Sequence, residues 1–168
     1  IAVTNFDNEM IGLYEPVGPG FADRAMEAGV GIASRDRLGF GCLFGDMDLD
    51  GYADLVVANG HIDDTVRNVG RRPSHAQAPH LFQNVGGQTF RDVAASVGAA
   101  FATPKIARGL ALGDFDRDGD LDVLLTTNAG PAYLYRNDVP AGNRSIRFYL
   151  EGRQSNRDAI GTVVHVYD

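Results

Sequence analysis

Short apolar runs rich in β-branched and aromatic residues recur along the chain, separated by polar segments that contain glycine. This pattern is typical of short strands joined by tight turns. An Ala-rich stretch at 22–29, with a counterpart at 91–98, is the one helix-like candidate. The sequence therefore predicts an all-β fold with strands near residues 1–4, 11–15, 40–44, 53–58, 79–83, 108–112, 121–126, 132–136, 146–151 and 162–167.

The pattern is also periodic over a longer distance. Leu81 follows Leu13 by 68 positions, and the segment 81–99 matches 13–30 once a one-residue gap is introduced. A third, partial copy begins at 134–138. A period of this length, built from short strands, favours the blades of a β-propeller over a β-sandwich.

Two acidic loops stand at the same point of successive repeats, DMDLDGYAD at 46–54 and DFDRDGDLD at 114–122. Carboxylates at alternate positions of a tight loop can converge on one point, and the glycine at the sixth position permits the turn. Ca²⁺ takes about 6–8 oxygen ligands from carboxylates, carbonyls and water. We therefore expect two Ca²⁺ sites, with the seventh residue of each loop giving its backbone carbonyl, and the candidate ligands are Asp46, Asp48, Asp50, Tyr52, Asp54, Asp114, Asp116, Asp118, Asp120 and Asp122.

Other interpretations of the loops are weaker. An EF-hand needs a bidentate Glu at the twelfth position, where this chain has Val57 and Leu125. Magnesium prefers a near-octahedral shell that keeps several waters, and zinc is disfavoured because neither loop contains His or Cys. Asp and Gly are ordinary turn formers, so the alternative to two metal sites is a pair of solvated acidic turns.

Charge and composition exclude several classes of function. The formal net charge of −7 has the wrong sign for a protein that binds nucleic acid through phosphate contacts. No apolar stretch reaches the roughly 20 residues of a membrane helix, so no membrane insertion is expected. Cys42 is the single cysteine, which excludes a disulfide framework within the chain. No Ser or Cys lies in a recognisable nucleophile motif, and the histidines are scattered, so the chain is expected not to be an enzyme.

Both loops, with their flanking strands, resemble FG-GAP/VCBS repeats, the calcium-binding blades of β-propellers. The matching stretches are LGFGCLFGDMDLDGYADLVVANG (38–60) and GLALGDFDRDGDLDVLLTTN (109–128), and SNRDAIG at 155–161 resembles the beginning of an ASPIC/UnbV domain. The resemblance implies about two and a half repeats of a larger propeller, with calcium loops between the strands. It divides the chain into a partial blade at 1–37, repeats at 38–105 and 106–138, and the beginning of an ASPIC/UnbV-like domain at 139–168.

These observations predict a non-enzymatic, calcium-binding segment with a structural, adhesion or assembly role. We expect it outside the cell or at the cell surface, or in the periplasm, because millimolar calcium keeps weak loops filled. Its partner would be a protein or a glycan. One alternative is a lectin-like module that stacks sugars on Tyr133, Tyr135 and Phe148. Another is a fibre subunit whose open blade edges are completed by neighbouring chains.

Overall fold

The computed structural model describes residues 1–65, 74–139 and 142–167, and their regular structure is nearly all β. Two single-turn helices, α1 (Val30–Ser34) and α2 (Ala99–Ala102), complete it, and neither has the length and apolar character that a membrane crossing requires. The all-β prediction is confirmed. The strands are β1 (Ala2–Val3), β2 (Gly12–Val17), β3 (Gly20–Asp23), β4 (Gly39–Gly45), β5 (Asp54–Asn59), β6 (His80–Val85), β7 (Thr89–Asp92), β8 (Ala107–Gly113), β9 (Asp122–Thr127) and β10 (Tyr133–Tyr135).

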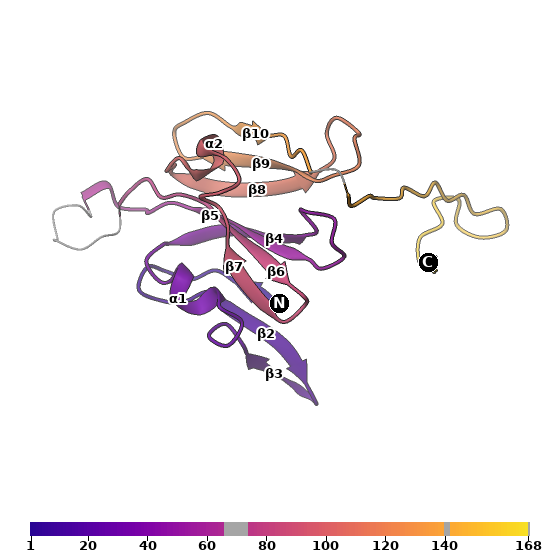
Figure 1. The fold of residues 1–168 in the computed structure, drawn as a ribbon, viewed down its shortest axis with the longest axis horizontal. Coiled ribbons are helices and arrows are strands. Elements are labelled where there is room, and N and C mark those ends of the chain that lie inside the picture. Colours follow the sequence, from indigo (N-terminus) through magenta and orange to yellow (C-terminus); the bar gives the residue numbers. More distant parts are fainter. Residues whose placement is uncertain (66–73, 140–141, 168) are drawn as a thin grey trace.

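The strands form three antiparallel sheets that follow the sequence repeat. The first sheet has the order β1-β2-β3, the middle sheet β4-β5-β6-β7, and the third β8-β9-β10. The sheets lie side by side in Figure 1, where β8 of the third sheet lies next to β4 of the middle one. In the described part of the chain the first sheet has no counterpart of β4, and the third has none of β7. Closure into a propeller stays a prediction.

The middle sheet has a hydrophobic core on each face, because successive side chains of β5 point to opposite sides. Leu55 and Val57 are fully buried toward the first sheet, where they pack with Phe82 and with Leu13 of β2. Val56 is fully buried on the other face, in the cluster that includes Val123 of the third sheet. The fully apolar run of β5 is therefore explained by a sheet covered on both sides.

Three predictions about secondary structure were wrong. Residues 146–151 and 162–167 form no strand, because strand propensity gives regular structure only with a partner strand, and none pairs with them among the described residues. The stretch 22–29 ends β3 and then forms turns, and the helix begins only at Val30. The sequence pattern also missed β3 and β7, which are short and largely exposed edge strands.

His80 lies at the buried start of β6 and is uncharged. Its Nδ1 accepts a hydrogen bond from Arg37 Nη1 at 3.1 Å, so Asp92 Oδ2, 4.0 Å from Nδ1, does not face an imidazolium. Burial, with the Arg37 charge beside it, lowers the pKa of His80 to about 3. In the unfolded chain the pKa is about 6.5, so as the pH falls the unfolded state binds a proton first. The stability that the neutral ring contributes is therefore present above about pH 6.5 and is lost between about pH 6.5 and 3.

We expect the free energy of unfolding to fall by about 2 kcal/mol through His80 between about pH 7.5 and pH 5. Urea unfolding in calcium-containing buffer at several pH values measures this, and a His80→Gln variant should lack that part of the pH dependence. His165→Gln, at an exposed position, is the matched control and should keep it. A His80→Gln variant with the pH dependence of the unmodified chain would contradict the assignment.

Candidate metal centres

The two acidic loops connect equivalent strands and fold alike. The first joins β4 to β5 and the second joins β8 to β9. At the fourth position, Leu49 and Arg117 have φ values of 58° and 68°, in the left-handed region that non-glycine residues rarely adopt. At the sixth position, Gly51 and Gly119 have φ values of 91° and 106°. Two sequences that differ at the fourth residue thus adopt the same strained turn, which curls the acidic side chains inward.

In the first loop the carboxylates of Asp46, Asp48 and Asp50 converge, and one oxygen from each lies within 4.8 Å of the others. Backbone N–H groups hold them there. Asp46 accepts hydrogen bonds from the N–H of Asp50 and of Gly51, both at 3.0 Å, and Asp50 accepts from Tyr52 N–H at 2.8 Å. These backbone hydrogen bonds hold the carboxylates close together in spite of their mutual repulsion.

In the second loop one carboxylate oxygen from each of Asp114, Asp116 and Asp122 lies within 4.8 Å of the others. Here two buried oxygens, Oδ1 of Asp114 and Oδ1 of Asp120, have no hydrogen-bond partner in the part of the chain that the structure describes. Burial raises the pKa of Asp120, with the Asp118 carboxylate adding to the effect. A buried carboxylate oxygen without a partner is costly, and a bound cation would remove that cost. The donor set of oxygens alone fits a hard cation such as Ca²⁺.

The ninth aspartate of each loop is a clamp, because it joins the loop to the third strand of the middle sheet or, in the third sheet, to the residues just after that strand. Asp54 is 1% exposed, and its two oxygens accept hydrogen bonds from Met47 N–H at 2.9 Å and Asn84 N–H at 2.7 Å. Asp122 accepts from Phe115 N–H at 2.8 Å and from Asn137 N–H at 2.9 Å in the same way. Burial raises the pKa of Asp54, and its two backbone hydrogen bonds oppose that shift.

The structure thus divides the ten candidate ligands. Six of them converge in the two clusters. Asp54 lies outside the first cluster and is instead the clamp that accepts the N–H groups of Met47 and Asn84. Asp118 accepts Asp120 N–H at 3.3 Å and lies outside the second cluster. Whether Tyr52 and Asp120 give their backbone carbonyls stays a prediction. The convergent residues are Asp46, Asp48, Asp50, Asp114, Asp116 and Asp122.

Sequence reasoning missed the polar residues around the loops. Gln83 Nε2 donates to Asp48 at 2.7 Å, and Asn137 Nδ2 donates to the Met47 carbonyl at 2.7 Å. Asn143 Nδ2 donates to the Asp48 carbonyl at 2.8 Å, and Arg147 forms an ion pair with Asp114. The segment that follows β10 therefore contacts both loops before it extends away from the sheets (Figure 1). The recurrence of Asn84 and Asn137 in LFQN and LYRN was the available signal.

Comparison with known proteins identifies the family that the central part of the chain matches. Residues 46–125 match the family of FG-GAP-like repeats, which confirms the resemblance. The chain is 36% identical over 84 residues to cartilage acidic protein 1 of Mus musculus and of Homo sapiens, and 44% identical over 84 residues to that of Xenopus tropicalis. Each alignment covers 50% of this chain and 13% of the relative, so the chain spans a small part of those proteins.

Proposed function

Because residues 46–125 are an FG-GAP-like repeat, we propose that this protein is a calcium-stabilised, non-enzymatic β module of an extracellular or cell-surface protein, with a role in structure, adhesion or assembly. The observation that carries the proposal is the pair of loops with the same turn conformation and three converging carboxylates each. One such loop could be an ordinary acidic turn. Two loops that lie 68 residues apart and share the same conformation support a common ligand.

Calcium would act on the fold through the strands that each loop joins. A cation held by Asp46, Asp48 and Asp50 would fix the β4–β5 connection, and one held by the second cluster would fix the β8–β9 connection. Two ions would also change the formal net charge from −7 to −3. The unpartnered oxygens of Asp114 and Asp120 would gain a positive partner, which supports a stabilising role at the second loop.

An extracellular location follows from the concentrations at which such loops fill. Calcium sites of extracellular modules have dissociation constants of about 10⁻⁴–10⁻³ M. Millimolar calcium saturates them, and the far lower cytosolic concentration does not. The relatedness to cartilage acidic protein 1 is consistent with a module of this kind.

Calcium titration by isothermal calorimetry should give two sites per chain. We expect Asp48→Asn to remove the first site and Asp116→Asn the second, so that each variant binds one ion. The exposed Glu9, far from both loops in sequence, supplies the control Glu9→Gln, which should bind two. Absence of binding at millimolar calcium, or variants that bind as the unmodified chain does, would leave acidic turns as the explanation.

The lectin-like alternative, in which the chain binds glycans, has less support than a role in structure, adhesion or assembly. The rings of Tyr133 and Tyr135 stack on each other with their centroids 6.1 Å apart, and Lys105 Nζ lies 5.0 and 5.4 Å from the two ring centroids. Phe148 lies on the segment beyond the sheets rather than beside them. A glycan array with no binding above background would exclude the lectin-like alternative, and a hit that Tyr133→Ala removes would restore it.

A further inference from the structure

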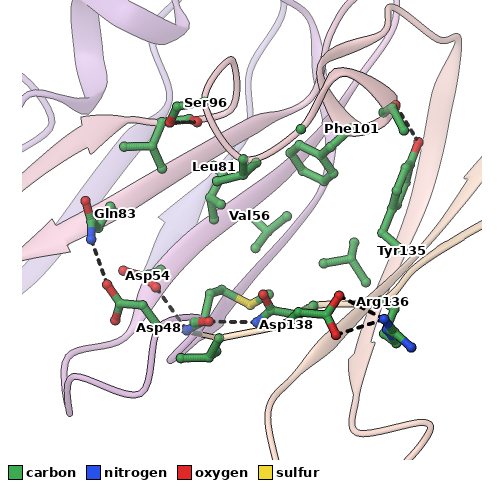
Figure 2. Close-up of a pocket in the computed structure, with 18 of the residues that line it drawn as sticks. Asp48, Asp54, Val56, Leu81, Gln83, Ser96, Phe101, Tyr135, Arg136 and Asp138 are labelled. Carbon is green, nitrogen blue, oxygen red and sulfur yellow. Dashed lines mark hydrogen bonds and ion pairs between the residues drawn. The ribbon is translucent and has the colours of Figure 1, made fainter. Parts of the chain in front are cut away.

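A groove of about 700 Å³ lies between the middle and third sheets (Figure 2). One of its sides is β10, whose strand partner among the described residues is β9 alone. The free edge of such a strand presents N–H and C=O groups that can pair with another strand. Apolar side chains from both sheets and from α2 form much of the wall: Val56, Leu81, Phe101, Val123, Leu134 and Tyr135.

The preceding repeat shows what occupies the same place. There β7 pairs with β6 as the fourth strand, and Phe90 N–H donates to the Ala28 carbonyl at 2.7 Å. The Phe90 side chain packs against the core between the first and middle sheets. Ala28 is covered, at 5% exposed, and a Cβ on Gly29 would lie 2.7 Å from the Phe90 carbonyl oxygen. The turn before α1 is thus the receiving surface for an edge strand.

The turn before α2 is the same surface, and no strand of the described residues lies against it. Ala94 is buried, and so is its counterpart Ala25 in the first repeat, so the two turns occupy equivalent places in the structure. Val97, however, is 51% exposed, and a Cβ on Gly98 would meet no atom within 4 Å. The place that β7 takes in the middle sheet is open in the third. The corresponding pairs are Ala25 and Ala94, Ala28 and Val97, and Gly29 and Gly98.

The register of an added strand follows from the two equivalent asparagines. The N–H of Asn84, within β6, and that of Asn137, two residues beyond the end of β10, each donate to the ninth aspartate of the preceding loop, so the two asparagines hold equivalent positions relative to their loops. In the middle sheet Asn84 lies opposite Phe90. An added strand in the same register would put its aromatic residue opposite Asn137.

We propose that this groove binds one extended polypeptide strand, supplied from outside residues 1–168, which pairs antiparallel with β10 and buries an aromatic side chain opposite Asn137. The N–H of that aromatic residue would donate to the Val97 carbonyl, as Phe90 does to Ala28. The occupant is a polypeptide rather than a small apolar molecule, because a strand edge is satisfied by backbone groups at strand spacing. The inference goes beyond the proposed calcium role and does not depend on it.

The test uses a peptide with the sequence of β7, the strand that fills the equivalent place in the middle sheet. A fluorescently labelled peptide of residues 86–94, GGQTFRDVA, is titrated with the full chain in calcium-containing buffer, and its anisotropy is measured. We expect saturable binding, weakened about tenfold or more when the peptide carries Phe90→Ser, because the buried ring supplies much of the affinity. On the protein, Val97→Arg should weaken binding by a similar factor. Val85→Arg is the matched control, since Val85 is equally exposed and lies outside the groove.

Several outcomes would overturn the proposal. Equal binding of the two peptides, or equal loss in the Val97→Arg and Val85→Arg variants, would show that the groove does not select a strand. Absence of saturable binding would do the same. The exposed Ile146 and Phe148 offer one more occupant, the chain's own tail. If the peptide binds only to the Ile146→Asp, Phe148→Asp variant, the tail fills the groove and an outside strand is excluded.

Discussion

Removal of calcium is expected to lower the midpoint of thermal unfolding by about 8–16 °C. This shift assumes that each loop binds calcium with a dissociation constant of about 10⁻⁴ M. At about 2 mM calcium a site of that affinity contributes roughly 2 kcal/mol. Two sites therefore give about 4 kcal/mol, and each kcal/mol shifts the midpoint by about 2–4 °C in a domain of this size. Scanning calorimetry or circular dichroism with calcium and with excess EDTA measures the shift.

The variant Asp46→Asn, Asp114→Asn removes one converging carboxylate from each cluster and should abolish the response. Its midpoint is expected to be the same in calcium and in EDTA. In the calcium-free state the relief of carboxylate repulsion is opposed by the loss of one acceptor oxygen at Asp46 and of the Arg147 ion pair at Asp114, so its midpoint should stay close to that of the unmodified chain in EDTA. If EDTA leaves the midpoint of the unmodified chain unchanged, the loops are acidic turns, whereas the strand-binding groove would be unaffected by that result.

Replacing Asp54 by Ala is expected to destabilise the fold by about 3–5 kcal/mol even without calcium. The substitution leaves the N–H groups of Met47 and Asn84 without acceptors in a buried place. Each such loss costs roughly 1–3 kcal/mol, and the side chain also leaves a cavity. Urea unfolding in EDTA measures the effect free of any metal contribution.

The exposed Asp50, in the same loop, is the matched control. In EDTA the Asp50→Ala variant should lose less than about 1 kcal/mol, whereas in calcium it should lose the stabilisation that the first site gives. Asp54→Asn keeps one acceptor oxygen and should fall between Asp54→Ala and the unmodified chain. Equal destabilisation by Asp50→Ala and Asp54→Ala in EDTA would show that the ninth aspartate is no clamp.

The sequence alone predicted the features that depend on local pattern. The fixed spacing of aspartates in 46–54 and 114–122 located both loops, and the 68-residue period located the equivalent strands. The apolar run of β5 is explained by the two covered faces of its sheet. Leu55 and Val57 pack into one core, and Val56 packs into the core on the other side. Local spacing, turn residues and hydrophobic runs suffice for such features because neighbours in sequence decide them.

Features that depend on residues distant in the chain were not predicted from the sequence. Asp54 resembles its neighbours as a ligand, and only the Asn84 N–H, 30 residues away, makes it a clamp. Thr89–Asp92 has no apolar alternation, yet it is a strand because β6 offers it an edge and Ala28 accepts from Phe90. The apolar segment 146–151 shows the converse, a strand pattern that finds no partner among the described residues.

Each named strand in the described residues pairs only with the strand before or after it. Pairings of this kind keep the strand contacts of each sheet within one continuous stretch of chain. A sheet could form as soon as its own strands have left the ribosome, without waiting for residues synthesised later. Such an arrangement also tolerates gene duplication, since an extra 68-residue unit would add a sheet at the end of the row and disturb only the sheet beside it.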